Sequence, residues 1–86
     1  MDSAEIVAEH LTYMRRRNLA DSTIAIRRRR LERFAAVSPL LEAEPADVER
    51  FLDSLELGPK STYDMLSHLG SFYRWAIDHG HTSHDP

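Results

Sequence analysis

Arginine is the residue type with the clearest capacity for binding chemistry in this chain. Eight arginines against two acids lie between Arg15 and Arg33, giving this stretch a local charge of +6. The remaining three basic and twelve acidic residues contribute −9, so the chain carries −3 in all. Arginine suits bidentate contacts with phosphate and guanine. This polarised pattern favours an anionic partner over the alternative of a solvated charged surface.

The four consecutive arginines, residues 27–30, fall in a segment with helical periodicity that we expect to span 22–37. They reach every side of a helix, and three of the four have no acid four residues away, although a stable surface helix prefers such pairs. Opposite the apolar stripe lies an arc that contains Ala25, Ile26, Arg29, Arg33 and Ala36, with Arg30 beside it. Such an arc can neutralise phosphates and reach base edges, and Ile26 can touch a thymine methyl.

Two other stretches hold residue types that bind ions. At Gly58–Thr62, a helix N-terminus with Lys60 and Ser61 can receive a phosphate, or Ser61 can simply cap the helix. From Asp78 to Asp85 the chain holds three histidines and two aspartates, but a terminal tail lacks the surrounding hydrogen-bond partners that hold the ligands of a metal site in place. We expect no metal site and no cofactor. His10 and His68 are expected to be packing or surface residues.

The amino-acid composition excludes several classes of protein. Eighty-six residues with 42% apolar and 29% charged side chains make one small globular domain, and no cysteine is present for disulfide or zinc chemistry. No apolar run approaches the ~20 residues of a membrane span. No nucleophile-elbow pattern occurs, so catalysis by this chain is not expected.

The periodicity predicts an all-α fold. Helices are expected at 3–17, 22–37, 45–55 and 60–79, with Ser3 capping the first and Asp21 or Ser22 the second. Asn18 and Gly80 are expected to end helices in the left-handed conformation. Gly70 is expected to allow close helix packing. Trp75 is expected to pack on the first helix, or else to serve another domain.

Four blocks of the sequence resemble the core-binding domain of tyrosine recombinases and phage integrases. The blocks are Asn18–Ile24 continuing to Leu31-x-x-Phe34, then Glu44–Val48 with Phe51-Leu52, then Gly58–Ser61, and finally Leu69-x-x-Phe72-Tyr73-Arg74-Trp75-Ala76. The blocks occur in the family's order and spacing over almost the whole chain. Gly80 and Asp85-Pro86 resemble the point where the family's linker leads to a catalytic domain.

The resemblance implies a compact four-helix SAM-like bundle of two crossed helical hairpins, with residues 1–80 as the DNA-binding domain and 81–86 as the start of a linker. It implies double-stranded DNA as partner, a catalytic domain elsewhere in the parent recombinase, and a cytoplasmic setting in a bacterial or phage-infected cell. The fragment is then expected to be a monomer and the parent a tetramer on DNA. The DNA-facing candidates are Thr23, Ile26, Arg27, Arg29, Arg30, Arg33, Lys60, Ser61, Asp64 and His68.

Two positions depart from the family pattern. Arg27 stands where the family often has an aromatic residue, which either shifts the helix or adds a phosphate contact. Asp64 is an acid where DNA is expected, so that it either selects a cytosine amino group or repels the backbone. The alternative function is a helical protein-interaction module that uses the acidic third helix and Trp75.

Overall fold

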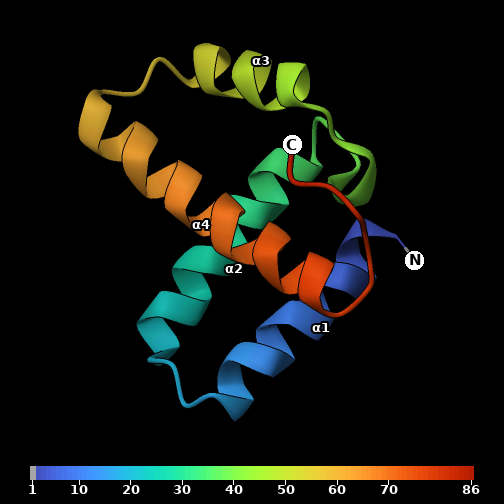
Figure 1. Cartoon of the computed structure of the whole chain (residues 1–86). Coiled ribbons are helices and arrows are strands. Elements are labelled where there is room, and N and C mark those ends of the chain that lie inside the picture. Colours follow the sequence, from blue (N-terminus) through green and yellow to red (C-terminus); the bar gives the residue numbers. More distant parts are fainter. Residues whose placement is uncertain (1) are drawn as a thin grey trace.

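Four α-helices and one short 3₁₀ helix make up the computed structural model, which describes residues 2–86. The α-helices are α1 (Ser3–Arg16), α2 (Asp21–Ala35), α3 (Pro45–Leu55) and α4 (Pro59–Asp78), and η1 (Leu40–Glu42) lies between α2 and α3. No strand occurs in this part of the chain. The pair α1–α2 and the pair α3–α4 lie across one another (Figure 1). The predicted all-α bundle of four helices is therefore confirmed.

The helix ends follow local backbone chemistry, with two differences from the prediction. Asp2, not Ser3, caps α1, and its carboxylate accepts a hydrogen bond of 2.8 Å from the backbone N–H of Glu5. Ala20 occupies the N-cap position of α2 and provides no side-chain cap. Asp21 lies instead inside the first turn, where its charge still faces the positive end of the helix dipole.

Two helix ends were predicted correctly from single residues. Asn18 has φ 58° and Gly80 has φ 76°, so both adopt the left-handed conformation that ends a helix. Glu56 adopts the same conformation, with φ 49°, after α3.

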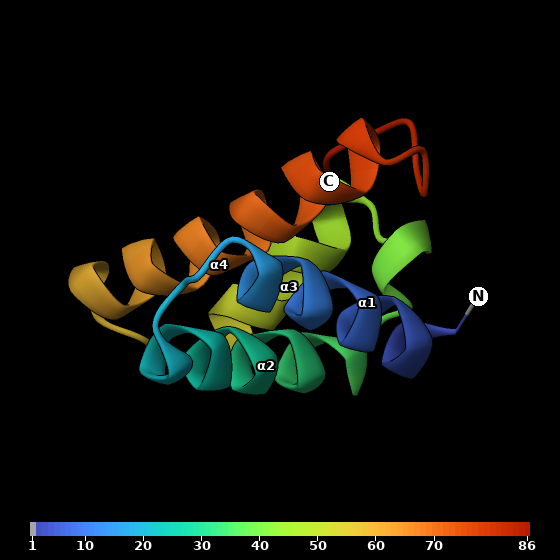
Figure 2. The ribbon, with the colours of Figure 1, turned by 90° about the horizontal axis from the view of Figure 1, so that it is seen from below.

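The core lies where α4 passes over α1 and α2. Figure 2 shows α4 and α2 on opposite sides of the molecule. The buried side chains between them include Leu31 and Phe34 from α2 and Phe72 from α4, all at 0% exposure. The Tyr73 hydroxyl donates a hydrogen bond of 2.6 Å to the backbone carbonyl of Leu40, which ties η1 to α4. Burial of these apolar and aromatic groups fixes how α2 and α4 cross.

Two expectations about α4 have opposite outcomes. Trp75 packs on α1, since its ring lies 4.8 Å from that of His10 and 6.2 Å from that of Tyr13. The expectation that Gly70 permits close helix packing is wrong. A Cβ at Gly70 would meet nothing within 4 Å, because this residue faces away from the other helices.

Residues 81–86 fold back on the bundle rather than leaving it. The His81 Nε2 lies 3.1 Å from the Glu9 carboxylate on α1, and the His81 ring lies 5.0 Å from that of Trp75. His84 Nε2 lies 3.2 Å from the backbone oxygen of Ala43. The end of the described chain therefore covers one side of the α4 C-terminus (Figure 1).

Candidate nucleic-acid interface

The N-terminal ends of α2 and α4 diverge from their crossing point toward one side of the molecule (Figure 1). Four of the ten candidate residues are exposed: Arg29, Arg33, Lys60 and Ser61. Thr23 and Ile26 are half-buried. Among residues 2–86, the ion pairs within 4 Å involve none of the three exposed cations. These cations are therefore available to an anionic ligand.

Arg30 and Asp64 join the two helices. The Arg30 Nε and Nη2 donate to Asp64 Oδ2 at 3.3 and 3.2 Å. Asp64, the acid expected near the ligand, therefore forms an ion pair with Arg30 of the same protein. Arg30 neutralises the charge of Asp64, and the contact sets the spacing between α2 and α4.

Arg27 turns toward the interior of the bundle. Its Nε donates to His68 Nδ1 at 2.8 Å, and its Nη1 lies 3.0 Å from His10 Nε2. Because a guanidinium has only donors, both histidine nitrogens act as acceptors, and each ring is neutral with its proton on the other nitrogen. Arg27 and His68, both proposed from the sequence as ligand contacts, therefore contact each other.

Burial controls the protonation of this network. Burial, reinforced by the charge of Arg27, lowers the pKa of His10 to about 4. Burial and then Arg27 also lower the pKa of His68, against the opposing effect of Asp64, which lies 3.6 Å away. Both rings are consequently uncharged near neutral pH and can accept the Arg27 hydrogen bonds.

The sequence did not reveal the partners of Arg27. From the family resemblance, Arg27 was expected either to shift the helix or to add a phosphate contact. His10 lies seventeen positions away on α1 and is 2% exposed. The only signal for this contact was a polar residue on the apolar edge of the first helix.

The N-termini of α2 and α4 lack side-chain caps, unlike that of α1. Gly58 occupies the N-cap position of α4, and its carbonyl accepts a hydrogen bond of 2.9 Å from the Thr62 N–H. The alternative in which Ser61 caps α4 is therefore wrong. The uncapped first-turn N–H groups and the helix dipole favour a negative charge at the N-terminus of α2 and at that of α4.

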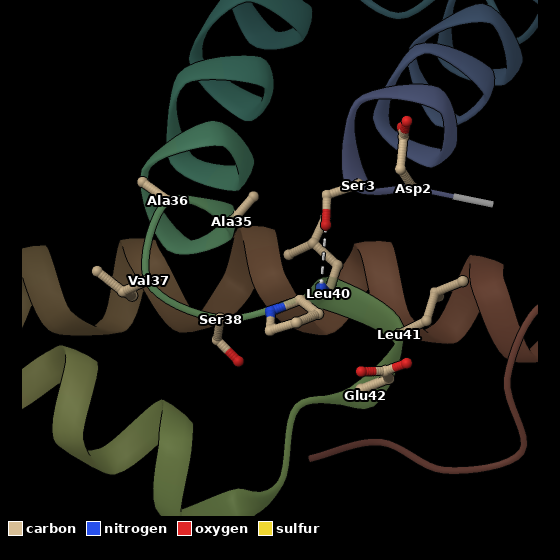
Figure 3. Close-up of a pocket in the computed structure, with 10 residues that line it drawn as sticks. Asp2, Ser3, Ala35, Ala36, Val37, Ser38, Leu40, Leu41 and Glu42 are labelled. Atoms are coloured by element: carbon tan, nitrogen blue, oxygen red, sulfur yellow. Dashed lines mark hydrogen bonds between the residues drawn. The ribbon is translucent and has the colours of Figure 1, made fainter.

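A surface hollow of about 510 Å³ lies at the other end of α2 (Figure 3). It is bounded by the start of α1, the end of α2 and η1, and the Ser3 Oγ accepts a hydrogen bond of 3.2 Å from the Leu40 N–H there. Its charged lining residues are the acids Asp2 and Glu42. This hollow does not suit an anionic ligand.

No group of three or more histidine, cysteine or carboxylate side chains in 2–86 is arranged to hold a metal ion. None of the helices in this range has the length and apolar character needed to span a bilayer.

Comparisons with protein-family models, curated proteins and solved structures find no match to this chain.

Proposed function

We propose that this chain binds duplex DNA through the joint face of α2 and α4. The observation that carries the proposal is the set of exposed cations Arg29 and Arg33 on α2 and Lys60 at the start of α4, which make no ion pair within 4 Å among residues 2–86, together with two uncapped helix N-termini. Each phosphodiester of the DNA backbone carries one negative charge, which both cations and free N–H groups recognise.

Within this proposal the residues have different tasks. Arg29, Arg33 and Lys60 contact phosphates and fix the register of the protein on the duplex. Thr23 and Ile26, which are half-buried in the first half of α2, contact base edges, with Ile26 on a thymine methyl. Arg27, Arg30, Asp64 and His68 hold α2 and α4 at their relative angle and act as positioning residues.

The sequence resemblance extends the proposal. The chain then acts as the core-binding domain of a site-specific tyrosine recombinase, holding the recombination half-site. Strand cleavage belongs to a separate catalytic domain, so this chain alone binds DNA without cutting it.

The test is an amide-shift NMR titration with a mixed-sequence duplex at two salt concentrations. We expect shifts clustered at residues 22–33 and 60–68 that weaken steeply with added salt. Arg29→Ala and Arg33→Ala should each reduce the slope of log K against log salt by about 1. Arg28→Ala is the matched control, because Arg28 is exposed on the same helix but borders the hollow between α1 and α2. Its slope should stay unchanged.

The absence of shifts at low salt would contradict the proposal. The exposed acids Glu49 and Asp53 of α3, with Glu56 directly after it, would then be the surface to test against basic proteins. The alternative function, a protein-interaction module, also depended on Trp75. Trp75 is 5% exposed, so its side chain is not available to a partner.

A further inference from the structure

An apolar stripe runs along the outer side of α4. Three of the large exposed apolar side chains belong to this helix: Tyr63 at 77%, Leu66 at 44% and Ile77 at 38% exposure. At about 100° per residue they fall within an arc of about 60° on the helical wheel, and Gly70 lies in the same arc. Isolated exposed apolar residues are ordinary, but a row along one helix indicates a contact surface.

The middle of this stripe is open. A Cβ at Gly70 would meet nothing within 4 Å. A shallow hollow of about 340 Å³ lies here, bounded by Leu66, Ser67, Gly70, Ser71, Arg74 and Asp85. A glycine with small neighbours on an exposed helix face lets another backbone approach closely.

The stripe is complementary to itself when reversed. Tyr63 and Ile77 are each seven residues from Gly70, in opposite directions, and so are about 10 Å from it along the axis. In two antiparallel helices that cross at Gly70, Tyr63 meets the partner's Ile77, and symmetry repeats the contact. Leu66, four residues from Gly70, then lies on the stem of the partner's Arg74.

Charge selects the same arrangement. Lys60 and Asp78 are both exposed, and neither has an ion-pair partner within 4 Å in the described part of the chain. They are eighteen residues apart, which is five full turns, so they lie on the same flank of the stripe. Antiparallel pairing brings Lys60 near the partner's Asp78, whereas parallel pairing would leave the two residues five turns apart along the helix axes.

We propose that the outer face of α4 binds a second copy of this chain in an antiparallel, two-fold symmetric contact centred on Gly70. The contact uses a face of α4 turned away from α2, so it overlaps the proposed DNA face only at Lys60. The test is therefore made without DNA.

The experiment measures the mass of the free protein by sedimentation equilibrium from micromolar to millimolar concentration. We expect the mean mass to rise from 9.9 kDa toward twice that value. Lys60→Asp and Asp78→Lys should each weaken the dimer by about tenfold, because each places like charges together. The double variant should recover most of the lost dimer affinity, as expected for residues in direct contact. Arg50→Asp makes the same charge change as Lys60→Asp, but at an exposed residue of α3. It is the matched control and should leave the dimer unchanged.

Gly70→Gln gives a second, independent test. Its side chain has open space in the monomer and removes a helix-interior glycine, so the melting temperature of dilute protein should rise. The same side chain blocks the crossing point and should abolish the dimer. A protein that stays at 9.9 kDa at all concentrations would overturn the proposal. A dimer that is indifferent to Gly70→Gln, or a double charge swap that fails to restore pairing, would overturn it equally.

Discussion

Arg27 shows how one side chain can be diverted from a surface role by two partners. Its guanidinium lies between His10 on α1 and His68 on α4 and also reaches Met14 Sδ at 3.9 Å. A half-buried charge is tolerated here because neutral imidazole nitrogens accept its hydrogen bonds. The cation therefore joins three helices, and it does so only while both rings remain unprotonated.

This arrangement predicts an acid-sensitive fold. The pKa of His10 falls from 6.5 to about 4 on folding, so below pH 6.5 the unfolded chain takes up a proton that the folded chain does not. The free energy of unfolding should therefore decrease as the pH falls through this window, by roughly 3 kcal/mol down to about pH 4. The lowered pKa of His68 acts in the same direction.

The measurement is urea unfolding at a series of pH values for the wild type and for His10→Gln. Glutamine can still accept a hydrogen bond from Arg27 but does not titrate. The difference in the free energy of unfolding between the wild type and His10→Gln should shrink as the pH is lowered from 7 toward 4. Parallel pH profiles would show that His10 does not remain neutral in the folded protein.

At the scale of single elements, the helix starts divide into capped and uncapped ends. Asp2 caps α1, and the Glu44 N–H ahead of α3 donates to the Asp47 carboxylate at 2.8 Å. The starts of α2 and α4 have no side-chain cap. The uncapped starts are those that belong to the proposed DNA face, where a ligand can satisfy the free N–H groups.

This division predicts unequal effects of similar substitutions. Asp2→Ala should lower the free energy of unfolding by about 1 kcal/mol, because it removes an N-cap. Ser22→Ala and Ser61→Ala should each change it by less than about 0.5 kcal/mol, because both serines are exposed and make no cap. Chemical denaturation of the three variants checks this. A loss at Ser22 or Ser61 equal to that at Asp2 would contradict the assigned caps.

At the scale of the whole molecule, opposite charges lie on different elements. The +6 stretch covers the end of α1 and most of α2, while α3 holds exposed acids. A chain with net charge −3 can therefore still attract DNA to one side. The acids of α3 oppose this attraction only over long range.

The double variant Glu49→Gln/Asp53→Asn tests this separation. Removing two distant negative charges should raise DNA affinity about twofold at low salt, when the Debye length reaches about 30 Å. Near physiological salt the length is about 8 Å, and the gain should vanish. Fluorescence anisotropy with a labelled duplex at both salt concentrations measures it. A gain that persists at high salt would place α3 in contact with the DNA.

The sequence by itself determined the elements. Helix-period apolar positions, Pro45 at a helix start, and Asn18 and Gly80 at helix ends act within a few residues, so four helices and their approximate limits were readable in advance. Charge segregation was equally readable, because it requires only counting. The identity of the capping residues was harder to predict from the sequence, since several neighbouring polar side chains compete for the same N–H groups.

Only the tertiary structure decided which polar side chains face one another. Arg27 and His10 are seventeen residues apart and Arg30 and Asp64 thirty-four, and no local pattern encodes such contacts. Gly70 likewise faces open space rather than a neighbouring helix, because that depends on where α1, α2 and α3 pack. The pairing of helices is fixed by shared burial of apolar surface across the whole chain, and it directs each remaining side chain to the interior or to the solvent.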